Sequence, residues 1–104
     1  MVKYVLAYKG GNQPASEEEG AKVMQAWMAW FGGLGAAVVD GGNPFGPSAA
    51  VAPDGTVSQA GPSGLTGYSI LSADNLGAAT ELAKGCPHLA SGGTVEIYET
   101  FDIM

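Results

Sequence analysis

The first apolar segment of the chain is Val2-Lys3-Tyr4-Val5-Leu6-Ala7-Tyr8, and its residue order is typical of a β-strand. Successive side chains of a strand point to opposite faces, so Tyr4, Leu6 and Tyr8 share one face. Val5 and Ala7 then share the other. Because both faces carry apolar residues, we expect residues 2–8 to form a strand whose two faces are both at least partly covered.

The segment that follows has the signals of an amphipathic helix. Ser16 is a suitable N-cap, and Glu19 stands three residues later, which is the spacing of a capping box. Apolar residues then recur every three or four positions until the glycine-rich stretch 32–35 ends the pattern. Trp27 and Trp30 in this pattern either form a platform for stacking a ligand or belong to the core. Their periodicity favours the core.

Turn residues divide the rest of the chain into short elements. Pro53-Asp54-Gly55 is a turn signal between two short segments, and Pro87 prevents a helix from continuing. Asp74 is the expected N-cap of a second helix. We expect a strand at 36–40, an edge hairpin with strands at 48–52 and 56–58, a strand at 65–73, a helix through 84 and a last strand at 94–101.

The order of these elements is β-α-β, hairpin, β-α-β, and they fit one domain over residues 1–104. This order predicts an α+β fold of the ferredoxin-like split βαβ type with an added edge hairpin. Such a fold has an antiparallel sheet with both helices on one face. The other face still carries large apolar groups, so we expect a homodimer in which two sheet faces pack together.

Charge and composition exclude several classes of function. The chain has four Lys, no Arg and ten carboxylates, with a formal net charge of -6. Binding to nucleic acid or to an anionic membrane needs a basic patch, which four scattered lysines do not form. The single Cys and the lack of a signal peptide or an apolar span indicate a soluble cytoplasmic protein. One His and one Cys are too few for a familiar metal site, and we expect neither a metal nor a cofactor.

Several short signatures resemble those of a known family when they are taken in order. They are KYVLAY at 3–8, VDGGNPF at 39–45, GYSI at 67–70, AATELAKGCP at 78–87 and GGTVEI at 92–97. Together they resemble the YCII-related domain proteins, in the branch with an Asp-Gly-Pro-Phe-like motif. The resemblance implies a dimeric α/β barrel with a cleft between the sheet and its loops.

The same resemblance implies little about catalysis. Some family members are thought to use a His–Asp pair, in which the His comes from the first helix and the Asp precedes a Pro. Here the expected first helix contains no His, and Cys86 precedes Pro87, so that pair does not carry over.

The candidate catalytic residues are His88 and Asp40. His88 is the only side chain that titrates near neutral pH without perturbation, so it is either an acid/base group or a surface or capping histidine. Asp40 ends a strand, where it either orients His88 or binds a ligand, or caps the next turn through an Asx hydrogen bond. Cys86 follows a helix C-terminus, where the helix dipole raises a thiol pKa, which favours a structural thiol over a nucleophile.

Six further residues are candidates for contact with a ligand: Tyr4, Tyr8, Asn43, Tyr68, Ser69 and Glu96. The hydroxyls either reach a ligand or lie at the edge of the core, and Glu96 points either to solvent or into a dimer cavity. Two functions stay open. One is a domain that binds a small organic molecule, aromatic compounds first among them, in a cleft at the sheet and dimer interface, with weak acid/base or lyase-type activity. The alternative is a non-catalytic homodimeric binding or accessory module.

Overall fold

A computed structural model describes residues 2–103 of the chain. Its helices and strands in chain order are β1 (Val2–Lys9), α1 (Glu17–Leu34), β2 (Val38–Asp40), β3 (Ala50–Val51), β4 (Val57–Ser58), β5 (Leu65–Ala73), α2 (Leu76–Ala83) and β6 (Thr94–Glu99). Short 3-10 helices at Gly35–Ala37 and Pro87–Ser91 precede β2 and β6. The predicted α+β class is confirmed, with one four-stranded antiparallel sheet and two helices.

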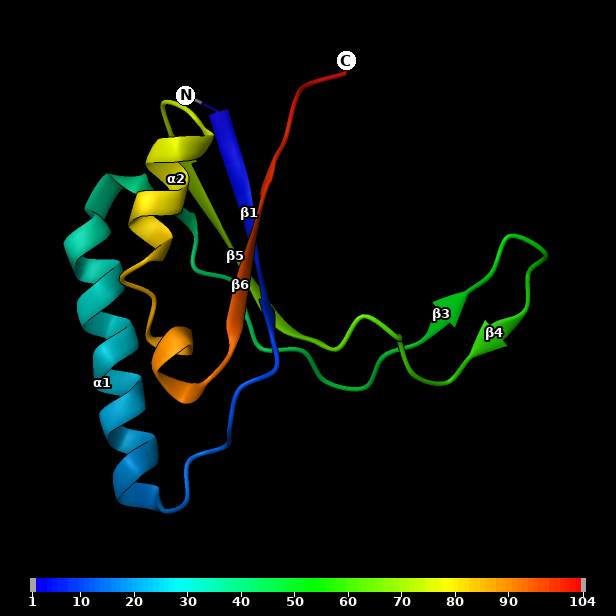
Figure 1. Cartoon of the computed structure of the whole chain (residues 1–104), viewed down its shortest axis with the longest axis horizontal. Coiled ribbons are helices and arrows are strands. Elements are labelled where there is room, and N and C mark those ends of the chain that lie inside the picture. The colour runs from blue at the N-terminus through cyan, green and yellow to red at the C-terminus, as the bar shows by residue number, and fades with distance from the viewer. Residues whose placement is uncertain (1, 104) are drawn as a thin grey trace.

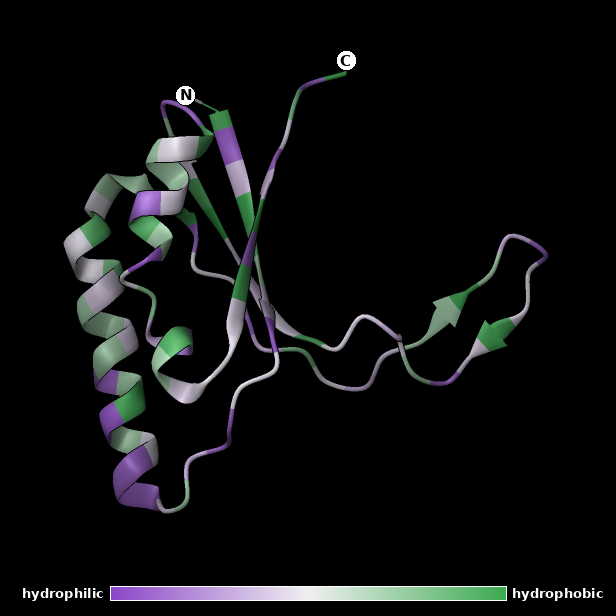
Figure 2. Ribbon diagram, viewed as in Figure 1, coloured by the Kyte–Doolittle hydropathy of each residue, from purple (hydrophilic) through white to green (hydrophobic). Residues whose placement is uncertain are grey.

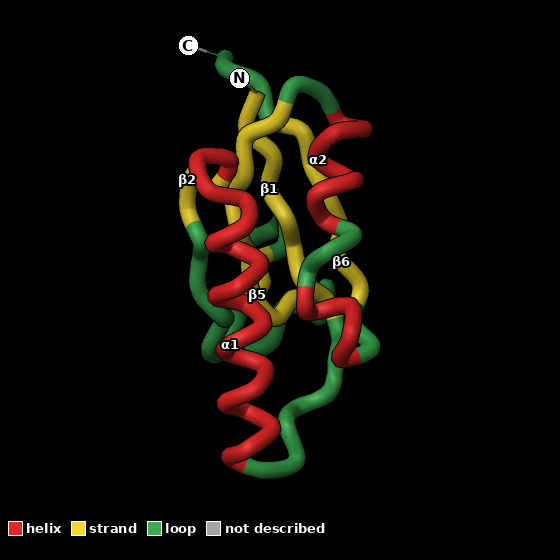
Figure 3. Tube along the Cα trace, turned by 90° about the vertical axis from the view of Figure 1, so that its left-hand side faces the viewer, coloured by secondary structure: helices red, strands yellow, loops and turns green. Residues whose placement is uncertain are grey.

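The strand order of the main sheet is β2-β5-β1-β6, and every neighbouring pair is antiparallel. β1 therefore lies inside the sheet, where Val5 is opposite Ile70 of β5 and Tyr98 of β6. Both helices cover the same side of the sheet, as Figures 1 and 3 show from two directions. We call the other side, which no helix of residues 2–103 covers, the open face.

The hydrophobic core lies between the sheet and the helices. Tyr4, Leu6 and Leu71 are fully buried there, packed with Ala79, Ala83 and other small residues of α2. Trp27 and Trp30 of α1 pack against this cluster, so the prediction that they belong to the core is confirmed. The Trp30 indole nitrogen also donates a hydrogen bond to the Leu82 carbonyl oxygen at 3.2 Å, which joins the two helices.

The start of α1 follows the expected capping pattern with one difference. The Ser16 hydroxyl oxygen accepts a hydrogen bond from the Glu19 amide at 3.2 Å, as an N-cap should. The Glu19 carboxylate, however, accepts its hydrogen bond from the Ala15 amide, one residue earlier than a capping box requires. The helix continues to Leu34, and Gly35 ends it with its amide bonded to the Phe31 carbonyl oxygen.

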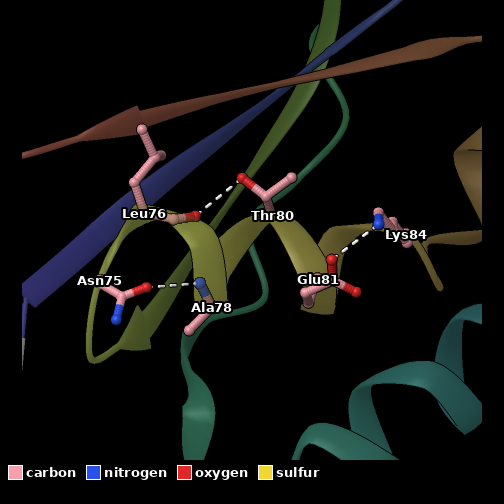
Figure 4. A network of polar contacts seen from close by, with 6 residues as sticks. All are labelled: Asn75, Leu76, Ala78, Thr80, Glu81 and Lys84. Atoms are coloured by element: carbon pink, nitrogen blue, oxygen red, sulfur yellow. Dashed lines mark hydrogen bonds and ion pairs between the residues drawn. The ribbon is translucent and has the colours of Figure 1, made fainter.

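The start of α2 corrects one prediction. The N-cap is Asn75, not Asp74, and its side-chain oxygen accepts a hydrogen bond from the Ala78 amide at 2.8 Å (Figure 4). Asn and Asp are almost equally good N-caps, so the sequence alone does not distinguish neighbouring candidates. An exposed ion pair between Lys84 and Glu81 lies at the other end of the helix.

The insertion between β2 and β5 also differs from the prediction. Its hairpin pairs Ala50 with Ser58 and Val51 with Val57, so the turn at 53–55 is confirmed. The hairpin is not an edge of the main sheet, because β3 and β4 form a separate two-stranded sheet. It stands well away from the sheet, on the side opposite the helices, at the end of a projection that we call the arm, residues 46–63 (Figure 1).

The chain on either side of the arm, which we call the arm root, is fastened to the end of β5. The Phe45 amide donates to the Thr66 carbonyl oxygen at 2.9 Å, and the rings of Phe45 and Tyr68 stack with centroids 5.8 Å apart. Gly42 has φ 75°, and a Cβ there would lie 1.7 Å from the Tyr68 carbonyl oxygen. Only glycine fits this close approach of two backbones, so the direction of the arm is fixed at its root.

We expect Gly42→Ala to lower the free energy of unfolding by at least about 2 kcal/mol. Alanine is strained in the left-handed backbone conformation of this position, and its Cβ would also clash with the Tyr68 carbonyl oxygen. Gly55→Ala is the matched control, since Gly55 has φ 89° with open space around its Cβ position. That change should cost only about 1 kcal/mol. Urea denaturation at one protein concentration measures both, and equal losses would contradict the close approach at the root.

Candidate functional site

The open face presents two rows of side chains that cross three strands. The first row is apolar and contains Ile70, Val5 and Tyr98 from β5, β1 and β6. The next row, nearer the arm, contains Tyr68, Ala7 and Glu96 from the same strands. The sequence left open which side of β1 faces the helices. The structure answers this, because Tyr4, Leu6 and Tyr8 belong to the core cluster and Val5 and Ala7 alternate with them.

Polar groups lie beside the apolar rows of the open face. The Tyr98 hydroxyl donates a hydrogen bond to a Glu96 carboxylate oxygen at 2.5 Å, and this bond raises the pKa of Tyr98. Lys3 lies on the same face, opposite Ser72 of β5. Neither Lys3 nor Glu96 forms an ion pair within the part of the chain that the structure describes. A carboxylate and a lysine are thus available on this surface.

His88 lies in the short 3-10 helix Pro87–Ser91 before β6, and its ring lies in space beside Gly11 and Gly93. Its Nε2 is 3.0 Å from the Lys9 carbonyl oxygen, which only accepts, so Nε2 carries a proton and donates it there. A Cβ at Gly93 would lie 2.1 Å from Nε2, and one at Gly11 would lie 2.9 Å from the ring. The ring also packs against the ring of Tyr8, with centroids 5.3 Å apart. His88 therefore joins the end of β1 to the start of β6.

Asp40 ends β2 on the other side of β5. Its Oδ1 accepts a hydrogen bond from the Gly42 amide at 2.8 Å, which is the Asx turn considered from the sequence. Within residues 2–103 no hydrogen bond joins Asp40 to His88. The two side chains predicted to act together each hold a loop to the sheet.

Three of the predicted ligand contacts lie inside the core. The Tyr8 hydroxyl donates to the Ser69 hydroxyl oxygen at 2.6 Å, and Ser69 donates in turn to the Gly41 carbonyl oxygen at 2.7 Å. Tyr4 is fully buried, and its hydroxyl donates to Glu99 at 3.0 Å. Burial raises the pKa of both tyrosines, so both remain protonated near neutral pH. The hydrogen bonds from Tyr8 through Ser69 to Gly41 tie the arm root to the core.

Asn43, Tyr68 and Glu96 are the predicted ligand contacts outside the core. Asn43 is exposed at the arm root, where its carbonyl oxygen accepts a hydrogen bond from the Tyr68 amide at 3.4 Å. Tyr68 and Glu96 share one row of the open face. The six predicted contacts are therefore divided between two sides of the sheet. Ile70 and Tyr98 were not among the predicted site residues, although strand alternation places Ile70 on the face of Tyr68 and Tyr98 on the face of Glu96.

Cys86 is almost fully buried at the end of α2, and burial raises the pKa of its thiol. A protonated, inaccessible thiol is a poor nucleophile, so the predicted structural role is favoured. Within residues 2–103, no group of three or more His, Cys, Asp or Glu side chains is arranged to hold a metal ion.

Two shallow hollows lie away from the predicted residues. One, of about 370 Å³, lies between the 3-10 helix before β2, the end of β5 and α2. The other, of about 380 Å³, lies where the last residues meet the start of β1, and it is lined by Val2, Lys3, Glu99, Thr100, Phe101 and Asp102. No catalytic or ligand-contact candidate from the sequence lines either hollow.

No family model matches the chain, and no curated protein matches it. Among residues 2–103, no helix is both long and apolar enough to cross a membrane.

The buried chain from Tyr8 through Ser69 to Gly41 makes a testable contribution to stability. Ser69→Ala leaves the buried Tyr8 hydroxyl and the part-buried Gly41 carbonyl oxygen without their partner and should lower the free energy of unfolding by about 1–3 kcal/mol. Tyr8→Phe leaves Ser69 bonded to Gly41 and should cost about 1 kcal/mol. Urea denaturation of both variants and the double variant measures the coupling, with Ser63→Ala, at an exposed serine, as the control. A Ser69→Ala cost equal to that of Ser63→Ala would contradict this role.

Proposed function

We propose that this chain is a YCII-like, ferredoxin-like domain that forms a homodimer through its open face and binds a small organic molecule between the two sheets. The strand order β2-β5-β1-β6, with both helices on one side, supports the ferredoxin-like part of the proposal. The single observation that carries the rest is the row of Ile70, Val5 and Tyr98 across an uncovered sheet. Val5 and Ile70 are half-buried and Tyr98 is 53% exposed, and an apolar row that no helix covers suits an interaction surface.

The side chains of the open face indicate the chemistry of the ligand. Tyr98 is 53% exposed and Tyr68 is half-buried, so both offer aromatic surface against which an aromatic ring can pack. Glu96 accepts hydrogen bonds, so it suits a ligand with hydroxyl or amide donors. The net charge of -6 disfavours strongly anionic ligands. A neutral or weakly charged aromatic molecule fits these groups best.

Acid/base catalysis by His88 and Asp40 is not part of the proposal. His88 uses Nε2 on the Lys9 carbonyl oxygen, and Asp40 uses Oδ1 on the Gly42 amide. Both interactions hold backbone segments in place, so removing them for catalysis would loosen the fold. This favours the non-catalytic binding module over the lyase-type reaction.

The dimer is tested by placing a charge on its expected centre. Ile70→Lys should weaken dimerisation by more than about a thousandfold, since burying an unpaired ammonium in each copy costs several kcal/mol. Sedimentation equilibrium should give twice the chain mass of 10.5 kDa for the unaltered protein and 10.5 kDa for the variant. Met28→Lys, on an exposed part of α1, should leave the dimer unchanged. An unaltered protein of 10.5 kDa at tens of micromolar would contradict the proposal.

Ligand binding is tested by thermal unfolding in the presence of small aromatic acids, amides and lactones. A compound that binds the folded protein should raise its Tm by several degrees at a concentration 100 times its Kd. Glu96→Gln should reduce that rise, and the variant should still sediment as a dimer because the central row of Ile70, Val5 and Tyr98 is unchanged. Glu18→Gln, in the exposed first turn of α1, is the matched control and should keep the full rise. A panel without any stabilising compound would count against the binding function.

A further inference from the structure

The arm has little within its own chain to hold it beyond its root. β3 and β4 are two residues long and pair only with each other. An isolated hairpin of this size is at most marginally stable in water. Val51 and Val57 are register partners, so they lie on one face of the hairpin, and they are 70% and 63% exposed. Figure 2 shows hydrophobic colouring on both of these strands at the far end of the arm.

A second exposed apolar group lies at the other end of the sheet. The Thr100 amide and hydroxyl both donate to the Lys3 carbonyl oxygen, at 3.0 and 2.8 Å, so the last residues are held at the start of β1. Phe101 and Ile103 follow, and each is 80% exposed. In Figure 1 this tail, residues 100–103, leans toward the same side of the sheet as the arm. The shallow hollow of about 380 Å³ lies beneath it.

A two-fold axis across the strands, through the row of Val5, brings these two groups together. Such an axis turns one sheet over onto the other and exchanges the two ends of every strand. The arm root lies beside the end of β1, where Tyr8 is opposite Gly67, and the tail lies at its start. The arm of each copy therefore extends toward the tail of the other.

The side chains of the open face are complementary under the same rotation. The large Tyr68 of one copy comes opposite the small Ser72 of the other, because these residues lie one row to either side of Ile70 on β5. Lys3 comes opposite Ala7 in the same way, next to Glu96 of the facing copy. Large groups thus meet small ones, and a lysine approaches a carboxylate that has no ion pair among residues 2–103 of its own copy.

The reach of the arm agrees with a clasp. Packed sheets lie about 10 Å apart, and an extended segment of six residues spans up to about 20 Å. The arm is long enough to pass the partner's sheet.

We propose that the arm of each copy clasps the second copy, with Val51 and Val57 packed against the partner's Phe101 at the tail. This inference rests on the proposed dimer and specifies its symmetry. It also gives the chamber between the sheets two end walls, each supplied by the other subunit. An unbound copy is therefore incomplete as a binding site.

Cross-linking tests the clasp directly. The double variant Val57→Cys with Phe101→Cys, oxidised with copper phenanthroline, should run mainly as a covalent dimer on a non-reducing gel. Val57 lies in β4 at the far end of the arm, whereas Phe101 follows Thr100 at the start of β1, so the two are too far apart for a disulfide within one chain. Cys86 is 3% exposed and stays out of the reaction. Each single variant is a control and should remain a monomer on the gel.

The other outcomes overturn the clasp in distinguishable ways. Cross-linking by Val57→Cys alone would mean that the arms pack on each other, and cross-linking by Phe101→Cys alone would mean that the tails meet. A double variant that sediments as a dimer but does not cross-link would refute the clasp and leave the sheet dimer standing. A double variant and an unaltered protein that both sediment as monomers would refute the clasp and the dimer together.

Discussion

Apolar side chains on a strand are stable only where another layer covers them, and this chain supplies a single layer of helices. Tyr4, Leu6 and Tyr8 are buried beneath that layer, because they alternate with Val5 and Ala7 along β1 and face α1 and α2. The consequence appears on the opposite side, where Ile70, Val5 and Tyr98 form a row without cover. The proposed assembly and binding chamber both follow from this one-sided coverage.

Buried hydroxyls and glycines extend the same constraint to the arm. Ser69 would be costly in a core without partners, but it receives one hydrogen bond from Tyr8 and donates another to Gly41. Gly42 then brings the outgoing chain against the backbone of β5. The residues that look like site groups in the sequence thus determine where the arm leaves the sheet.

The sequence predicted the elements well because their signals are local. Ser16 and the alternation in residues 2–8 carry their structural meaning within a few positions, and both predictions are confirmed. The separate position of the hairpin was not predictable, because turn residues at 53–55 specify pairing within the hairpin but not where it attaches. For His88, the partner is a backbone carbonyl 79 residues earlier in the chain, and no residue type signals such a contact. Strand alternation, in contrast, already placed Tyr98 with Glu96.

The most direct measurement of the central claim is an isotope-filtered NOE experiment on a mixture of labelled and unlabelled protein. It detects contacts between copies only, so it reports on the open face without any substitution. Packing of the two open faces should give NOEs from the methyl groups of Val5 and Ile70 in one copy to Val5, Ile70 and the ring of Tyr98 in the other. Filtered spectra without these NOEs, at concentrations where ordinary spectra show the folded chain, would contradict it.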